Sequence, residues 1–248
     1  MKSRILWLVF GLGAIVGAIV FLPAGLLAVA VEGLSDGRLV LAEARGRVWQ
    51  GQGKLVLQMR PGAAMNLGDI NWRISPSRLV VAELAVDLQQ DIAGQRGSAL
   101  LTVSPGGKRI RDADLRVPAA LLADFSPAWA ALTPAGWLRL QSHDFAFRAG
   151  EFVGEVQASW APARFFGGVE AGAYHLALRG EAGARLAGTL STQGGDIQAS
   201  GQGNWQMKTG LQARVRLALQ AGAENGRALP LFRALCAGVR QECEFNIQ

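Results

Sequence analysis

The chain has 248 residues, half of them hydrophobic, which is enough for one large domain or two small ones with a buried core. Its formal net charge of +6 leaves three classes of partner open: nucleic acid, anionic lipid or an acidic protein. The arginines are spaced along strand-like segments and are not clustered. This spacing argues against nucleic-acid binding and favours a solvated, mildly basic surface.

The N-terminal region is apolar. The sequence from Ile5 to Val31 carries no charge, and about 20 apolar residues are enough to cross a hydrocarbon layer roughly 30 Å thick. We therefore predict an N-terminal transmembrane helix, with residues 1–31 forming a cytoplasmic N-terminus and a membrane anchor. A cleaved signal peptide is the alternative, since Ala28 to Ala30 could serve as a cleavage site. Apolar regions of signal peptides are usually about 7 to 15 residues long, so the length favours a retained anchor.

The charges on either side of this segment predict its orientation. Lys2 and Arg4 precede it, whereas Glu32 and Asp36 follow it. The positive-inside rule then leaves the N-terminus in the cytoplasm and places residues 32–248 in the periplasm. This location is a second argument against nucleic acid as a partner.

Beyond the apolar segment, alternation of apolar and polar residues predicts strands. Ile70, Trp72 and Ile74, for example, share one face of their segment. Glycine-rich turns separate such segments, and about a dozen short strands joined by tight turns indicate an antiparallel meander. The clearest alternating segments are residues 53–60, 69–75, 83–89, 98–104, 137–142, 144–150, 155–160, 173–180, 184–192 and 213–220.

Helix signals after the anchor are few. Residues 117–125 begin with Pro118 near the first-turn position and could form a short helix, whereas Ser75 to Leu79 reads as a turn. The predicted fold is all-β: a transmembrane helix, then one domain over residues 32–248. That domain is a large curved antiparallel sheet, open or partly closed, with one or two short helices.

Two short segments are alike. "PAGLLA" at residues 23–28 and "PAALLA" at residues 118–123 each precede an apolar stretch and then a glycine that leads into a strand. An internal duplication that extends one sheet and a chance agreement of six residues both explain this similarity.

The segment "GRVWQGQG" at residues 46–53 has glycines spaced as in some nucleotide-binding loops. Such a loop delivers phosphate to the N-terminus of a following helix, whereas a strand-like segment follows Gly53. We interpret Gly51 and Gly53 as turn or bulge residues and Trp49 as an aromatic anchor in the sheet. If the ring of Trp49 is fully buried, Trp49→Ala should destabilise the domain by about 3 to 5 kcal/mol.

A second segment, "GQGNW" at residues 201–205, has a similar composition. A tryptophan in an alternating strand more often packs on the sheet than binds a ligand. We assign structural roles to both segments and to the tryptophan of residues 70–74. The residues concerned are Gly46, Val48, Trp49, Gly51, Gly53, Trp72, Gly201, Gly203 and Trp205.

The two cysteines, Cys236 and Cys243, lie close together near the C-terminus. Outside the cytoplasm, an even number of nearby cysteines more often indicates a disulfide than a metal site. The chain has only two histidines, and neither lies near the cysteines in sequence. We predict a disulfide that closes a small loop.

Few residues could support catalysis. His143 and Asp144 are neighbours in a strand-like segment, so their side chains point to opposite faces, and His175 lies on the polar face of its segment. No serine has the context of a nucleophile elbow, and no carboxylates are spaced for a metal cluster. We therefore predict that the protein is not an enzyme and has no cofactor and no metal.

The sequence resembles protein N of the bacterial type II secretion system, the general secretion pathway N family. The resemblance includes a G-x-V-W-x-G core formed by Gly46, Val48, Trp49 and Gly51. The paired cysteines are not part of the pattern of that family. The segments that carry the resemblance are residues 22–28, 37–57, 70–79, 117–122 and 189–205.

This resemblance implies a single-pass protein of the bacterial inner membrane whose periplasmic β domain belongs to the secretion machinery. We expect an accessory, non-enzymatic scaffolding or assembly role, with the secretin or inner-membrane platform proteins as partners. The alternative is a lipid-binding or lipid-guiding protein, because a curved sheet with an apolar face could hold acyl chains. Alternation shows that one face is apolar, not what covers it.

Overall fold

The computed structural model describes residues 20–59, 62, 64–124, 127–166, 168–206, 208–223, 226–236 and 241–247. Most of the predicted membrane span, residues 5–19, lies outside these residues. The chain divides into two compact units, unit 1 (Met1–Arg96) and unit 2 (Gly97–Gln248). The sequence had indicated a single β domain over residues 32–248.

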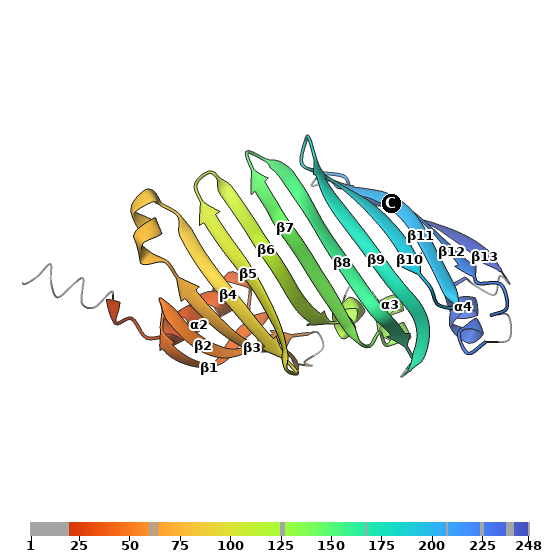
Figure 1. Ribbon diagram of the computed structural model, residues 1–248, viewed down its shortest axis with the longest axis horizontal. Coiled ribbons are helices and arrows are strands. Elements are labelled where there is room, and N and C mark those ends of the chain that lie inside the picture. Colours follow the sequence, from red (N-terminus) through yellow and green to blue (C-terminus); the bar gives the residue numbers. More distant parts are fainter. Residues whose placement is uncertain are drawn as a thin grey trace, which may run out of the picture. The chain divides into compact units, whose positions relative to one another are not determined.

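Unit 1 contains four antiparallel strands that follow one another in chain order (Figure 1). A helix precedes the first strand, and a short 3₁₀ helix joins the third to the fourth. The elements are α2 (Gly25–Leu34), β1 (Leu39–Arg47), β2 (Gln50–Gln58), β3 (Ala64–Ile74), η1 (Pro76–Val81) and β4 (Leu84–Ile92).

The strands of unit 2 also follow one another in chain order. Each strand from β6 to β13 pairs antiparallel with the one before it in the chain. The elements are β5 (Gln95–Ser104), which begins at the border of the units, β6 (Gly107–Pro118), η2 (Ala119–Asp124), α3 (Pro127–Leu132), β7 (Trp137–Arg148), β8 (Glu151–Phe165), β9 (Val169–Glu181), β10 (Arg185–Gln193), β11 (Ile197–Gln206), β12 (Gly210–Leu219), α4 (Leu229–Leu235) and β13 (Glu242–Ile247).

The predicted all-β antiparallel fold is confirmed, and in both units the described strands form an open sheet. The expected number of helices was too small, since the described residues hold five short helical segments: α2, η1, η2, α3 and α4. Four of these have only six or seven residues, and the fifth has ten. So few residues hardly display a period of 3.6, so the pattern of apolar residues did not reveal them.

The N-terminal boundary of the folded part differs from the prediction. The Leu22 carbonyl accepts a hydrogen bond from the Val48 amide at 2.9 Å, and the Ala24 amide donates to the Gly46 carbonyl at 3.1 Å. The chain is therefore bonded to the strands of unit 1 from Leu22 onward, whereas the sequence had predicted an anchor that extends to Val31. Pro23 explains the difference, because proline disfavours a helical conformation in the residue before it. Among the described residues, no helix has the length and hydropathy needed to span a membrane.

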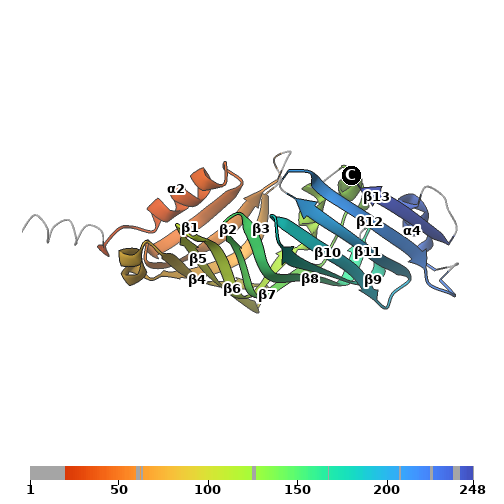
Figure 2. The ribbon, with the colours of Figure 1, turned by 90° about the horizontal axis from the view of Figure 1, so that it is seen from above.

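Helix α2 packs on one side of the unit 1 strands (Figure 2). Beneath it lies a core of buried side chains from β1 and β3, and Leu27 and Ala28 of α2 pack against this core. The "PAGLLA" segment thus contributes Ala24, Leu27 and Ala28 to the packing of unit 1. The buried core residues are Ala24, Leu41, Ile70, Trp72 and Ile74.

The core of unit 2 lies where α4 and the segments around η2 and α3 cover one side of the strands. Phe232 and Leu231 of α4 have no exposed surface, and Ile197 of β11 is 1% exposed. Trp160 and Phe165 of β8 belong to the same cluster, with ring centroids 4.9 Å apart. Helix α4 is therefore the main apolar cover of this part of the sheet.

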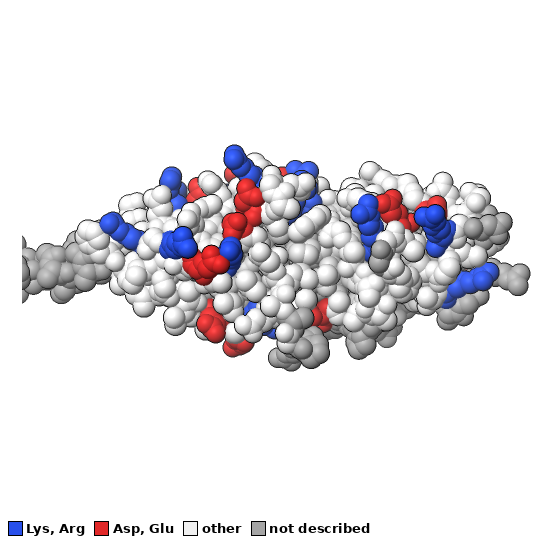
Figure 3. Space-filling model, turned by 90° about the horizontal axis from the view of Figure 1, so that it is seen from below, with Lys and Arg blue, Asp and Glu red and all other residues white. Residues whose placement is uncertain are grey.

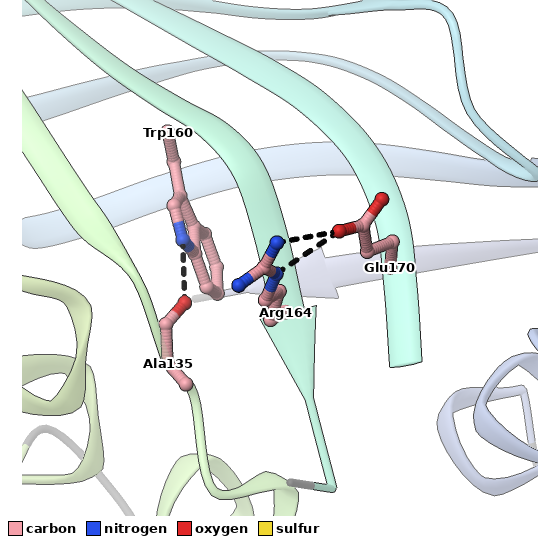
Figure 4. A network of polar contacts seen from close by, with 4 residues as sticks. All are labelled: Ala135, Trp160, Arg164 and Glu170. Carbon is pink, nitrogen blue, oxygen red and sulfur yellow. Dashed lines mark hydrogen bonds and ion pairs between the residues drawn. The ribbon is translucent and has the colours of Figure 1, made fainter. Parts of the chain in front are cut away.

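A buried tryptophan marks each unit. The Trp72 indole nitrogen donates to the Val48 carbonyl at 2.9 Å, and that of Trp160 donates to the Ala135 carbonyl at 3.0 Å. Figure 4 shows the Trp160 ring pointing toward Ala135, beside the ion pair between Arg164 and Glu170 on neighbouring strands. Both indole N–H groups are thus satisfied away from water, as buried tryptophans require.

The burial of Tyr174 on β9 should make the free energy of unfolding depend on pH. Its phenol donates to the Ile197 carbonyl at 3.1 Å, and burial raises the pKa of Tyr174 to about 12, above the ordinary value of 10.0. The folded state therefore favours the neutral phenol. This contribution is fully present below pH 10 and is lost as the pH rises toward 12.

Because Tyr174 is the only tyrosine in the sequence, its tyrosinate absorbance reports this group alone. We expect the native chain to titrate near pH 12 and the chain unfolded in urea to titrate near pH 10. Tyr174→Phe should remove the corresponding loss of stability at alkaline pH. A native titration near pH 10 would show that the phenol is solvated.

Cys236, at the end of α4, and Cys243 of β13 form a disulfide with their Cα atoms 5.7 Å apart. The bond ties the helix that covers the unit 2 core to the last described strand. We expect thiol-blocking reagents to leave the intact mass unchanged before reduction and to add two groups after it. Two modified cysteines in unreduced, periplasmically expressed protein would contradict this pairing.

Candidate functional site

The first glycine motif forms the hairpin between β1 and β2. Arg47 pairs with Gln50, so Val48 and Trp49 are the two residues of the connection. The hairpin end is held by neighbouring segments, since the Ile74 amide donates to the Trp49 carbonyl at 2.7 Å. The Val48 amide also donates to the Leu22 carbonyl, and the Trp72 indole nitrogen donates to the Val48 carbonyl. Three hydrogen bonds to neighbouring segments therefore hold the turn.

The glycines of this motif make room for other groups. A Cβ atom at Gly51 would lie 2.4 Å from the Trp72 ring and 2.4 Å from the Arg45 carbonyl. Gly51 is the direct cross-strand partner of Trp72, so the indole lies over the glycine. Gly53 is similarly covered, with the Leu41 side chain 2.9 Å from its added Cβ. These contacts are those of an architectural element.

Two tryptophans of this region contact the unit 1 core to different extents. Trp72 is only 3% exposed and belongs to the core, whereas Trp49 is half-buried and packs against it. Trp72 is therefore the more deeply buried of the two aromatic residues. Trp49 is itself a residue of the turn.

The second motif lies in unit 2, on β11, and does not share a site with the first. Gly203 pairs with Gly188 on β10, and Trp205 pairs with Leu186. The Trp205 ring meets Phe152 of β8 edge-on at a centroid distance of 5.7 Å. This position is compatible with the expectation that Trp205 packs on the sheet.

A cavity of about 1100 Å³ opens on unit 1 beside the hairpin. Its charged lining consists of Arg45, Arg47 and Arg73 with one acid, Asp87. Cross-strand pairing sets their spacing, because Gln50 is the partner of both Arg47 and Arg73. The other lining residues are Val20, Gly46, Trp49, Gln50, Gly51, Gln52, Asn71, Trp72, Pro76, Leu79 and Gln89.

Sequence reasoning missed this cavity. Its arginines are separated in sequence, and only the register of β1, β2 and β3 brings them together. The signal was present in the alternation, since Asn71 and Arg73 occupy the face opposite Trp72. Residues 75–79, predicted as a turn, contribute to η1 and to one wall of the cavity.

Some of the other surface charges form ion pairs. Figure 3 shows basic side chains beside acidic ones along the view from below. The ammonium of Lys54 lies 2.7 Å from Glu43, and its hydrogen bond lowers the pKa of that carboxyl. Among the described residues, no ion pair includes the three cavity arginines. The cavity therefore gathers three arginines and one acid, Asp87, which is the cross-strand partner of Arg73.

The residues considered for catalysis do not assemble into a site. His143 is almost fully exposed, with Nδ1 at 3.0 Å from Asp112, and Asp144 pairs instead with Arg109 at 3.4 Å. Within the described ranges, no three His, Cys, Asp or Glu residues are grouped to hold a metal ion.

The lipid-groove alternative gains no support. The apolar side of each unit carries a helix-covered core, and charged and amide side chains interrupt the lining of the unit 1 cavity. A groove for acyl chains would need a continuous apolar lining, because an unpaired polar group is costly to bury.

The strand order and the packed cores define a class: an all-β protein of consecutive antiparallel strands whose motifs build hairpins and cores. The family model of type II secretion system protein N matches residues 37–231. The chain belongs to this family and is thus a component of type II secretion. No match was found among curated proteins or among solved structures.

Proposed function

We propose that the protein is a non-enzymatic accessory component of the type II secretion machinery that acts by scaffolding or assembly through its two β units. The match over residues 37–231 carries this proposal, because it covers strands of both units. The glycine and tryptophan motifs support it, since their contacts serve the sheet. In this account Gly46, Val48, Gly201 and Gly203 have structural roles only.

The proposed location is the bacterial inner membrane. The uncharged segment that starts at Ile5 would cross it once, with Lys2 and Arg4 in the cytoplasm and both β units in the periplasm. The folded chain beginning at Leu22 supports a shorter anchor than the sequence first indicated, ending near Phe21.

The outer strand of unit 2 offers a docking edge. Among the described residues, β13 pairs only with β12, so one row of its backbone N–H and C=O groups is available to another strand. A secretin or an inner-membrane platform protein is the proposed partner. Addition of a strand from that partner would join the two proteins by main-chain hydrogen bonds.

In-cell photo-crosslinking tests this proposal. A photoreactive residue at Asn246, exposed on β13, should give adducts with secretin or platform subunits. Gln157 is the matched control, because it is exposed on β8, a strand paired on both sides. If neither Asn246 nor Gln157 gave adducts with secretion subunits, in protein present at normal abundance, the docking edge would be rejected.

A further inference from the structure

One end of unit 1 displays apolar side chains next to the point where the described chain begins. Val20 and Phe21 are 43% and 62% exposed. Figures 1 and 2 both place this first segment and the connection from β3 to β4 at the same end of unit 1. Val20, Pro76 and Leu79 also line the same cavity.

The connection from β3 to β4 carries three consecutive exposed apolar residues. Leu79, Val80 and Val81 of η1 are 42%, 89% and 71% exposed. Soluble proteins rarely expose contiguous apolar side chains without a function. Two consecutive valines with this exposure gain nothing from contacts within their own chain.

The backbone of this apolar tip is firmly held. The Ala82 amide donates to the Leu79 carbonyl and the Glu83 amide to the Arg78 carbonyl, each at 3.0 Å. The side chains of Arg78 and Glu83 form an ion pair across the same turn. The valines are therefore presented outward by a closed 3₁₀ turn.

Positive charge surrounds the apolar tip. Arg45, Arg47 and Arg73 line the cavity behind it, and the guanidinium of Arg47 lies 4.3 Å above the Phe21 ring. Apolar residues beside arginines are suited to the boundary between acyl chains and anionic headgroups, where the apolar part is buried and the guanidinium binds phosphate.

The connection to the N-terminal segment determines which surface lies nearby. Leu22 is already bound to Val48, so the folded unit begins directly after the proposed anchor, which ends near Phe21. The anchor and the unit are therefore joined with no intervening linker. Such an anchor keeps this end of unit 1 at the membrane surface.

We propose that this end of unit 1 docks on the anionic periplasmic surface of the membrane. Val80 and Val81 enter the interfacial layer, and Arg45, Arg47 and Arg73 bind lipid phosphates. The proposal rests on the membrane anchor in the proposed function. It differs from the lipid-groove alternative, because the lipids stay in the bilayer and no acyl chain is carried.

The test uses the full chain in bilayer nanodiscs containing phosphatidylglycerol. The native cysteines are joined in a disulfide, so a fluorophore can be placed on one added cysteine, Val80→Cys. Ala93→Cys is the matched control: it is exposed at the opposite end of β4, a strand of nine residues, hence about 30 Å away. Nitroxide-labelled lipids should quench the label at residue 80 several-fold more than that at residue 93.

Two variants separate the contributions of the tip and of the charge. Val81→Glu, an exposed position, should reduce quenching at residue 80. Arg47→Gln with Arg73→Gln should remove the difference in quenching between phosphatidylglycerol and phosphatidylcholine discs.

Incorporation of the chain with no quenching at residue 80, or with equal quenching at both positions, would overturn this inference alone. A chain that does not enter the bilayer would also overturn the anchor. A residue 80 that is shielded from labelling in cells, and whose label is not quenched in nanodiscs, would indicate a protein partner. That result would also overturn the membrane-docking inference.

Discussion

Trp72→Ala is expected to lower the free energy of unfolding of unit 1 by about 3 to 5 kcal/mol. The ring is 3% exposed, covers Gly51 and satisfies the Val48 carbonyl through its indole N–H. Its removal would leave a cavity in the core and a carbonyl without this partner. Hydrogen exchange of the β2 and β3 amides, followed by mass spectrometry of the full chain, measures this loss in unit 1 itself.

Two controls make the Trp72 result specific. Trp49→Ala should have a clearly smaller effect, because that ring is half-buried at the margin of the core. Trp72→Phe keeps part of the side-chain volume and loses the hydrogen bond. Its loss of unfolding free energy should therefore lie between those of Trp49→Ala and Trp72→Ala. Equal effects of Trp49→Ala and Trp72→Ala would show that the hairpin, and not the Trp72 contact, holds this core.

Phe232→Ala is expected to destabilise unit 2 by about 3 to 5 kcal/mol. Phe232 of α4 has no exposed surface and belongs to the same buried cluster as Trp160 and Ile197. Loss of the ring should loosen α4 from the sheet. Faster exchange of the β11 and β12 amides would report this loosening.

Arg233→Ala provides the matched control on the same helix. Arg233 is exposed, and surface substitutions of this kind usually change stability by no more than about 0.5 kcal/mol. If Phe232→Ala were as mild as Arg233→Ala, α4 would not be the main cover of the unit 2 core. The disulfide between Cys236 and Cys243 would then be the main contact that holds α4 on the sheet.

The antiparallel strands were predictable from local features. Alternation in residues 69–75 assigned Ile70, Trp72 and Ile74 to one face, and all three are buried in the unit 1 core. The hairpin at Val48 and Trp49 was also accessible, because glycines flank it and strand-like residues follow. Local chemistry determined these features, so a single sequence could report them.

Features that depend on register or on short contacts were not predictable. The arginine-lined cavity requires the pairing of Gln50 with both Arg47 and Arg73, which no sequence pattern reports. The predicted anchor extended to Val31, whereas Ala24, Leu27 and Ala28 pack in the unit 1 core. Pro23 is a local signal for an earlier end of the span.

A secretion assay in cells lacking this protein tests its assignment to type II secretion most directly. We predict that folded proteins normally exported by this system accumulate in the periplasm and that the full-length chain restores their release. A periplasmic protein that does not use the system should be unaffected and serves as the control. Unchanged release of every exported protein after deletion would contradict the assignment.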